Sequence, residues 1–378
     1  MLLTKLNNTF PVALAVTLLS LGVSTAIAAE PSFLPTEQYQ LKIETVASGL
    51  SHPWGLAFLP DGRLLVTERS GQMRLVQQGQ LSAPLAGLPN IAVGGQGGLL
   101  DVLLDNNFAS NQQLYFSYAE PGADGSNSTA VASAKLTATG LTAVKVIFSQ
   151  QPKVDSKYHF GGRLVQQPDG QLFVTLGDRG SQREAVQQLN SHIGKVVKID
   201  VQGQATAGNP FAGDKTAKAE IWSYGHRNIQ GAALDPQGRL WTHEHGPQGG
   251  DEINITAAGK NYGWPLITYG EEYGGGVIGK TAAAGLEQPL HYWVPSIAPS
   301  GMSFYQGQAF SKWQHNLLVG SLKFGQLVRL EISADKVTHE ERIRIGSRIR
   351  DVKTAPDGSV YLLTDEDNGA ILKLTPLP

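Results

Sequence analysis

Short runs of alternating apolar residues recur along the chain, and each follows the same kind of turn. Pro-Asp-Gly stands at residues 60–62, 168–170 and 356–358, and Asp-Pro-Gln-Gly stands at residues 235–238. The runs that follow are RLLVTER, QLFVTLGD, SVYLLTDED and RLWTHEHG. Proline and glycine preset the backbone angles of such a turn, and the aspartate side chain closes it with a hydrogen bond. The pattern predicts four short strands, each entered through a tight turn.

Two weaker runs fill the remaining intervals, NQQLYFS at residues 111–117 and HNLLVGS at residues 315–321. The six signals divide roughly 350 residues into units of about 58, a period typical of propeller blades. Such a blade buries its faces only against its neighbours, so the ring must close. The sequence therefore predicts an all-β protein, a six-bladed β-propeller with four-stranded antiparallel blades. The alternative, an ordinary β-sandwich, is disfavoured by the length of the chain.

Composition agrees with this fold class. The 378 residues include 44 Gly and 20 Pro, which lie between the β-rich runs and favour all-β over α/β structure. The best helical candidate, residues 183–189, spans about two turns and is expected to lie in a loop. A formal net charge of −2 gives no basic surface for nucleic acid. Because the chain has no Cys, its fold rests on packing, with bound ions as a further source of stability.

The first 29 residues form a separate segment. Lys5 gives a short positive region, residues 12–23 are mostly apolar, and residues 26–28 (Ala-Ile-Ala) form a small-x-small cleavage signal. The apolar run is too short to span a membrane. The sequence predicts that residues 1–29 are a secretory signal peptide and that residues 30–378 form a single β-propeller catalytic domain. The protein is then expected in the periplasm or outside the cell, without a membrane span.

Residues 221–264 carry the densest polar chemistry of the chain. Within residues 226–228 (His-Arg-Asn), the arginine and asparagine offer several N–H donors to a carboxylate or quinone oxygen. In residues 243–245 (His-Glu-His), the two histidines would share one face of a strand, as metal ligands could, but no HExxH pattern indicates a zinc protease. Gly246 and Pro247 offer carbonyl oxygens suited to calcium. This stretch is expected to line the propeller mouth and help hold a charged cofactor and calcium.

Further candidates lie outside this stretch. His159 stands in a loop near glycines, and an imidazole titrates close to neutrality, which suits a general base; a structural histidine is the alternative. Gln96 lies in GGQGGLLD, whose glycines would let the backbone approach a ligand, although a plain tight loop has the same pattern. No GxxxxGK[ST] motif supports a nucleotide P-loop. Four cations at equivalent blade positions instead suggest a polyanionic small ligand: Arg227, Lys323, Arg348 and Arg350.

A series of short sequence motifs also runs through nearly the whole chain after residue 29. They are HPWGLAFLPDGRLLVTER, GGQGGLLD, HFGGRL, LGDRG, SYGHRNIQG, EHGPQGGDEIN, NYGWP, LKFGQL and RIRDVKTAPDG. No single motif is diagnostic. In their order and number, the motifs resemble those of the soluble pyrroloquinoline quinone (PQQ)-dependent aldose sugar dehydrogenases, of the soluble glucose dehydrogenase type. The resemblance implies a six-bladed propeller with PQQ lying flat at the top of the channel.

The resemblance also implies a role for each candidate residue. His159 would be the catalytic base that takes the proton of the anomeric hydroxyl, and Arg227 would be a second catalytic residue beside the quinone oxygens. Cofactor binding is implied for Arg227, Asn228, Lys323, Arg348, Arg350 and Tyr273. Sugar binding is implied for Gln96 and Tyr273. Calcium binding is implied for the carbonyls of Gly246 and Pro247, with a second site at Glu252 and the carbonyl of Tyr262.

The expected function is that of a quinoprotein oxidoreductase that oxidises aldoses at the anomeric carbon to lactones and passes electrons to an unidentified acceptor. His245 stands where the glucose-specialised members carry Gln, and the chain lacks their longer insertions, so the resemblance favours the broad-range aldose branch. Two alternatives remain. A metal-dependent lactonase would use calcium and His159 but would leave the channel cations without a task. A glycan-binding propeller would need no catalytic residues at all.

Overall fold

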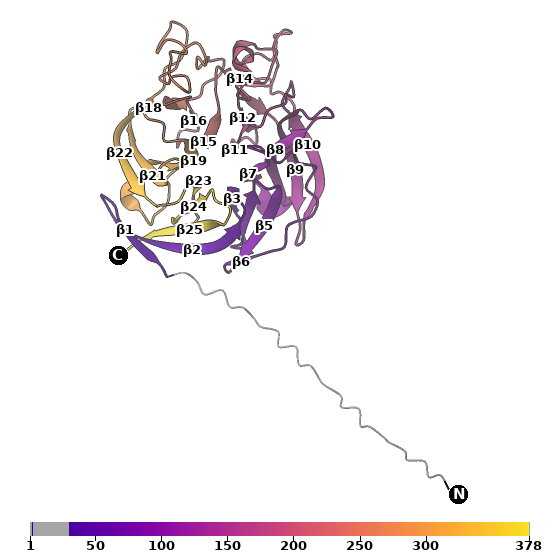
Figure 1. The fold of residues 1–378 in the computed structure, drawn as a ribbon, viewed down its shortest axis with the longest axis vertical. Coiled ribbons are helices and arrows are strands. Elements are labelled where there is room, and N and C mark those ends of the chain that lie inside the picture. The colour runs from indigo at the N-terminus through magenta and orange to yellow at the C-terminus, as the bar shows by residue number, and fades with distance from the viewer. Residues whose placement is uncertain (1, 3–29, 378) are drawn as a thin grey trace.

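The structure, a computed structural model, describes residues 2 and 30–377. The predicted signal peptide, residues 1–29, lies outside the described residues apart from Leu2. Nearly all of the regular structure is β-strand (Figure 1), which confirms the predicted fold class. The helical elements of the described residues are short: α1 (Phe108–Asn111), η1 (Arg183–Gln187) and η2 (Ser311–Trp313).

The strands of residues 30–377 form six sheets, which are the blades of a propeller around a central channel (Figure 1). The innermost strands are β3 (Pro53–Phe58), β7 (Leu99–Leu104), β11 (Gly161–Gln166), β15 (Ile229–Leu234), β19 (Pro299–Phe304) and β23 (Ile349–Thr354). The second strands are β4 (Leu64–Glu68), β8 (Gln113–Pro121), β12 (Leu172–Leu176), β16 (Leu240–Glu244), β20 (Leu317–Ser321) and β24 (Val360–Thr364). Outside them lie β5 (Gln72–Gln77), β6 (Gln80–Leu81), β9 (Asn127–Leu136), β10 (Leu141–Ser149), β13 (Lys195–Ile199), β14 (Ile221–Tyr224), β17 (Asp251–Ile255), β18 (His291–Trp293), β21 (Gln326–Ser333) and β22 (Lys336–Arg344). The predicted six-bladed antiparallel propeller is confirmed.

The two ends of the chain close the ring. β2 (Gln40–Leu50) pairs antiparallel with β25 (Gly369–Pro376), so the last blade has the order β1-β2-β25-β24-β23. Figure 1 shows this blade combining indigo strands from the start of the chain with yellow strands from its end. β1 (Ser32–Pro35) adds a fifth strand at the outer edge, which the sequence pattern does not predict.

The recurring turn has the same place in its blades. It joins the innermost strand to the second strand, as residues 60–62 do between β3 and β4 and residues 356–358 do between β23 and β24. Because neighbouring strands are antiparallel, the first residues of the innermost strands and the last residues of the second strands meet at the opposite face of the propeller. This opposite face, the site face, carries His159, Asn228 and Arg348, each of which lies just before an innermost strand.

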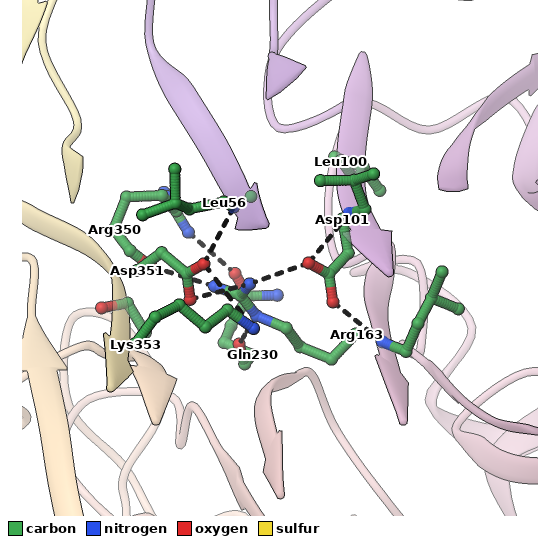
Figure 2. Close-up of polar contacts among 12 residues, drawn as sticks. Leu56, Leu100, Asp101, Arg163, Gln230, Arg350, Asp351 and Lys353 are labelled. Carbon is green, nitrogen blue, oxygen red and sulfur yellow. Dashed lines mark hydrogen bonds and ion pairs between the residues drawn. The ribbon is translucent and has the colours of Figure 1, made fainter. Parts of the chain in front are cut away.

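A buried charged cluster fills the central channel (Figure 2). Nη1 of Arg163, in β11, lies 3.3 Å from Oδ1 of Asp101 in β7 and 3.0 Å from Oδ1 of Asp351 in β23. The same guanidinium donates through Nε to the carbonyl of Gln230 (2.8 Å) and through Nη2 to the carbonyl of Arg350 (3.0 Å). One side chain thereby connects the innermost strands of four blades.

The hydrophobic core lies between neighbouring blades. Leu65, Met73 and Leu75 of one blade belong to the same buried cluster as Leu114 and Phe116 of the next. Alternate apolar residues of the predicted strands supply these contacts, as expected for blades that cover one another. Within the described residues, no helix has the length and apolar character needed to cross a membrane.

Candidate functional site

Two adjoining cavities open at the site face. The channel cavity has a volume of about 390 Å³, and its walls include Trp54, Arg69, Asn228, Gln230, Lys323, Arg348 and Arg350. The rim cavity has a volume of about 730 Å³, and its walls include His159, Arg179, Arg183, Arg227 and Tyr273. Gln96 lines both cavities. Every residue predicted to contact sugar or cofactor therefore lines one of the two.

The channel cavity is rich in cations that one carboxylate holds in place. Nη2 of Arg350 lies 2.7 Å from Oδ2 of Asp365, and Nη2 of Arg348 lies 3.2 Å from the same oxygen. Burial alone would raise the pKa of Asp365, but the charges of Arg350 and Arg69 hold it well below its usual range. Asp365 is therefore ionised and anchors two cations, while Lys323 is exposed at the cavity. Such a concave positive surface concentrates small anions.

His159 lies just before β11 with its backbone in the left-handed region, at a φ of 50°. Its backbone N–H donates to Oε1 of Gln96 (2.8 Å), and its Nδ1 lies 2.5 Å from Oδ1 of Asp178. The carboxylate fixes the tautomer that carries the proton on Nδ1. Burial lowers the pKa of His159, although Asp178 opposes this shift. The ring is therefore neutral near pH 7, and its Nε2 has no protein partner among residues 30–377.

Asp178, the partner of His159, is a residue to which the sequence pattern alone assigned no role. Its side chain is 1 % exposed and accepts hydrogen bonds from Nε1 of Trp264 and from the N–H of Gly180, both at 2.8 Å. A sequence pattern could have identified Asp178, because an acidic residue stands at or just after the end of the second strand in four blades of the described structure. These residues are Glu68, Asp178, Glu244 and Asp365.

Arg227 and Asn228 lie just before β15 and are both buried. Nη1 of Arg227 donates to the carbonyl of Gly246 (2.8 Å). Oδ1 of Asn228 accepts from the N–H of Gly161 (3.3 Å) and from Nε2 of Gln230 (3.2 Å), which leaves its amide N–H groups for a ligand. Within the described part of the chain, Nε of Arg227 is buried without a hydrogen-bond partner, as is Nε of Arg350. Such donors are costly to bury and need a ligand or water.

A third, small cavity holds most of the predicted calcium ligands. Its walls include Glu244, Gly246, Glu252 and Tyr262. Its volume of about 10 Å³ is close to the minimum for one bound water. Pro247 is buried nearby in the chain but is not part of these walls. The structure therefore brings Gly246, Glu252 and Tyr262 together and leaves Pro247 beside them.

Two carboxylic acid side chains, Glu244 and Glu252, and the cationic side chain of Arg227 line this third cavity. Glu244 and Glu252 are direct partners across the β16–β17 pair, where two carboxylates repel each other. Burial, together with the charge of Glu244, raises the pKa of Glu252 well above its usual value. No group of three His, Asp or Glu side chains suited to a metal occurs among the described residues. A cation here would depend on backbone carbonyls as well as on the two carboxylates, a donor set that suits calcium.

Three histidines of residues 221–264 were assigned neither the role of general base nor that of a cofactor ligand. His226 is fully buried, with Nδ1 2.9 Å from Glu244 and Nε2 2.9 Å from the hydroxyl of Ser223. His243 is fully buried without a hydrogen-bond partner in the described structure. His245 donates through Nε2 to the carbonyl of Pro299 (2.7 Å). The suggested metal role for the His-Glu-His run has no third ligand in the described residues.

The site combines a neutral imidazole, oriented by a carboxylate, with a neighbouring cavity of cationic donors on a β-propeller. The chain belongs to the glucose/sorbosone dehydrogenase family, whose model matches residues 50–373.

Relatives of known structure agree with this assignment. The aldose sugar dehydrogenase YliI of Escherichia coli is 46 % identical over 346 residues, which cover 89 % of this chain and 93 % of that protein. The crystal structure of the soluble E. coli aldose sugar dehydrogenase in the apo-form has a TM-score of 0.86 at 46 % identity and covers 89 % of this chain and 100 % of that one. The PQQ-bound aldose sugar dehydrogenase of Streptomyces coelicolor has a TM-score of 0.72 at 28 % identity and covers 90 % of this chain and 99 % of that one.

Proposed function

We propose that this protein is a PQQ-dependent aldose sugar dehydrogenase that oxidises sugars at the anomeric carbon to lactones. The observation that carries the proposal is the His159–Asp178 pair, which faces a cavity next to the cation-lined channel cavity. Two relatives, an aldose sugar dehydrogenase and a PQQ-bound aldose sugar dehydrogenase, support it.

The residues of the channel cavity fit PQQ, an anionic tricarboxylate quinone. Lys323, Arg348 and Arg350 provide positive charge for its carboxylates, and Asn228 presents free amide N–H groups. The buried Nε atoms of Arg227 and Arg350 have no partner in the described structure, as expected where a ligand completes the site. When bound, PQQ supplies a quinone that accepts hydride from a substrate carbon. Tyr273, 69 % exposed, is proposed to form a wall for cofactor and sugar.

His159 is proposed to accept the proton of the anomeric hydroxyl through Nε2. Loss of hydride from a carbon leaves positive charge there, which removal of the neighbouring hydroxyl proton relieves. Asp178 stabilises the imidazolium that forms, because it already accepts from Nδ1. Gln96 lines both cavities beside this ring and is proposed to contact the sugar.

Arg227 is proposed to stabilise the negative charge that develops as the cofactor is reduced. Its guanidinium is held by the carbonyl of Gly246, so the donor is oriented before the reaction begins. Asn228 is proposed to act in the same way through its amide N–H groups. Both would interact more strongly with the charge that develops in the transition state than with the uncharged quinone, which would lower the barrier to hydride transfer.

Calcium is proposed as the second cofactor. Glu252, Gly246 and Tyr262 meet in the third cavity, and Pro247 offers a further carbonyl beside it. A divalent cation there would neutralise the repulsion between Glu244 and Glu252. Residues 1–29 are proposed to direct export, so the enzyme of residues 30–378 would act in the periplasm or outside the cell.

An absorption experiment tests the proposed function. The purified protein is supplied with calcium and PQQ, and an aldose is then added. The expected result is a reduced-quinone band that appears only after the sugar and that forms about 10²–10⁴ times more slowly in the His159→Ala variant. Sugar oxidation without any change of the quinone spectrum, or lactone hydrolysis instead of oxidation, would contradict it. A lactonase would also leave the cations of the channel cavity without a role.

A further inference from the structure

The side chain of Gln230 joins two residues of the proposed cofactor site that belong to different blades. Gln230 is the second residue of β15, is 8 % exposed, and lines the channel cavity. Its Nε2 donates to Oδ1 of Asn228 (3.2 Å), and its Oε1 accepts from Nη1 of Arg350 (3.1 Å). Asn228 lies just before β15, whereas Arg350 belongs to β23. One amide therefore connects two donors that approach the cavity from separate sheets.

The backbone beneath this amide is fixed by the channel cluster. Arg163 donates through Nε to the carbonyl of Gln230 and through Nη2 to the carbonyl of Arg350, as Figure 2 shows. Together with the Gln230–Arg350 bond, these contacts close a loop of hydrogen bonds among three residues. Asp101 and Asp351 hold the guanidinium of Arg163 from either side. Gln230 thus rests on a rigid base and has little freedom to turn.

The direction of the Gln230 amide determines which atoms its neighbours present. The N–H of Gly161 and Nε2 of Gln230 occupy Oδ1 of Asn228, so its own N–H groups point elsewhere. Gln230 and Asp365 occupy Nη1 and Nη2 of Arg350, and its buried Nε has no partner in the described structure. A glutamine has a donor and an acceptor at one end, so it satisfies both neighbours at once.

We infer that Gln230 is a positioning residue for the cofactor. It fixes the amide direction of Asn228 and the plane of the Arg350 guanidinium, so that both present N–H donors to the same ligand. This inference rests on the proposed function, because it concerns the donors that would hold PQQ. Pre-positioned donors bind a ligand more tightly than mobile ones, since no ordering cost is left at binding.

The test measures the binding of PQQ to the calcium-loaded apoprotein by fluorescence or absorbance titration, without any turnover. Gln230→Met removes both hydrogen bonds at similar volume. Gln230→Asn keeps a buried amide that is one methylene too short to reach both partners. Each variant is expected to raise the Kd for PQQ by roughly ten- to hundredfold, as for the loss of one hydrogen bond to a charged group, Arg350, with or without a second to the neutral amide of Asn228. Gln150→Met is the matched control, because Gln150 is fully buried and lines neither cavity.

A double-mutant cycle separates positioning from general damage. In the Arg350→Met background, Gln230→Met is expected to raise the Kd clearly less than it does alone, because one of its two partners is already gone. In the Lys323→Met background, it is expected to raise the Kd by its full factor, because Lys323 lines the same cavity but has no hydrogen bond to Gln230 among the described contacts. Thermal unfolding of each apoprotein reports folding separately.

The outcomes are distinguishable. Unchanged PQQ affinity in both Gln230 variants, or an equal factor in both backgrounds, would overturn the inference. Should Gln230→Met not fold, Gln230→Asn carries the same test, because it preserves the buried amide. A wild-type protein that binds no PQQ would overturn the proposed function instead.

Discussion

Among the described residues, three histidines lie just before an innermost strand and pair with a carboxylate at or just after the end of a second strand. Both ring nitrogens of His52 and of His226 have hydrogen-bond partners within the protein. His159 uses only Nδ1, toward Asp178, and its ring lines the rim cavity. All three residues carry the same imidazole ring, so the surrounding residues determine which ring keeps a nitrogen without a protein partner.

His159→Ala is expected to bind PQQ nearly normally and to lose about 10²–10⁴ in kcat, the usual contribution of a positioned base. In the wild type, the rate should fall as pH drops through the pKa of His159, because a protonated ring accepts no proton. Burial lowers that pKa, so the acid limb should lie below the ordinary value of about 6.5. Rates measured across pH should show this limb in the wild type and not in the variant. A variant with near-normal turnover and the same limb would place the base elsewhere, with His245 next to test.

Asp178→Asn is expected to reverse the tautomer of His159. Trp264 donates to one oxygen of Asp178, so an amide that keeps this contact would turn its NH₂ toward Nδ1. The ring proton then moves to Nε2, and the base is lost, with an expected loss of about 10²–10⁴ in kcat. PQQ affinity, measured by titration, is the control and should change little. Full activity at unchanged stability would show that Asp178 does not orient the base.

At the scale of the element, the third residue of the innermost strands follows a simple rule. Three strands place a charged residue there, Asp101, Arg163 and Asp351, and the other three place a glycine, Gly55, Gly231 and Gly301. A Cβ on Gly55 would lie 2.8 Å from Oδ1 of Asp101, and one on Gly301 would lie 2.2 Å from Oδ1 of Asp351. Gly55 and Gly301 thus leave room for the carboxylates that hold Arg163 in the channel, whereas a Cβ on Gly231 would lie 2.1 Å from Nε2 of His243.

Gly301→Ala is expected to destabilise the protein by about 1–3 kcal/mol, because its methyl group would displace Asp351 from a packed channel. Gly208→Ala is the matched control, since a Cβ there has no neighbour within 4 Å. The control should change the free energy of unfolding by less than about 0.5 kcal/mol. Denaturant-induced unfolding of both variants makes the comparison. Equal midpoints would show that the channel has spare room.

At the scale of the whole molecule, the site exists only when the ring is closed. The channel cavity takes Trp54 from β3, Gln230 from β15, Lys323 from the loop after β20 and Arg350 from β23. The last of these blades is itself completed by β2, from the other end of the chain. A ligand that contacts several blades binds only the folded ring, so binding must stabilise the fold.

Removal of calcium is expected to lower the melting temperature and abolish activity, and added calcium should restore both. A ligand at a hundred times its Kd stabilises the folded state by about 2.7 kcal/mol. Differential scanning calorimetry with and without a chelator, followed by calcium, makes the measurement. Better restoration by zinc than by calcium would contradict the oxygen-ligand site at Glu252, Gly246 and Tyr262.

Broad aldose specificity is the remaining expectation at this scale. The rim cavity of about 730 Å³ is wide, and the exposed Tyr273 is one of its walls. Several aldoses are therefore expected to react with similar kcat/KM. A preference of about three orders of magnitude for one hexose, roughly 4 kcal/mol in transition-state binding, would contradict this expectation.

The blades could be predicted from the sequence because turns and strands depend on residues that are close together in the chain. The turn residues and the alternating strands are short-range features, so the six blades and the antiparallel order followed from the pattern. His159, Asn228 and Arg348 were also found from local position, because residues just before innermost strands must meet at one face. Glu252, Tyr262 and Tyr273 came only from the family resemblance. The acidic residue that recurs at or just after the end of the second strand was also visible in the sequence, as Asp178 and Asp365.

The contacts between blades became known only from the tertiary structure. The bridge from Gln230 to Arg350, the cluster around Arg163 and the pairing of β2 with β25 join residues far apart in the chain. No local pattern encodes such pairs, because each depends on the rotation of one blade against another. The same reason explains why three similar histidines differ: burial and neighbours, set by closure of the ring, leave one ring nitrogen of His159 without a partner among the described residues.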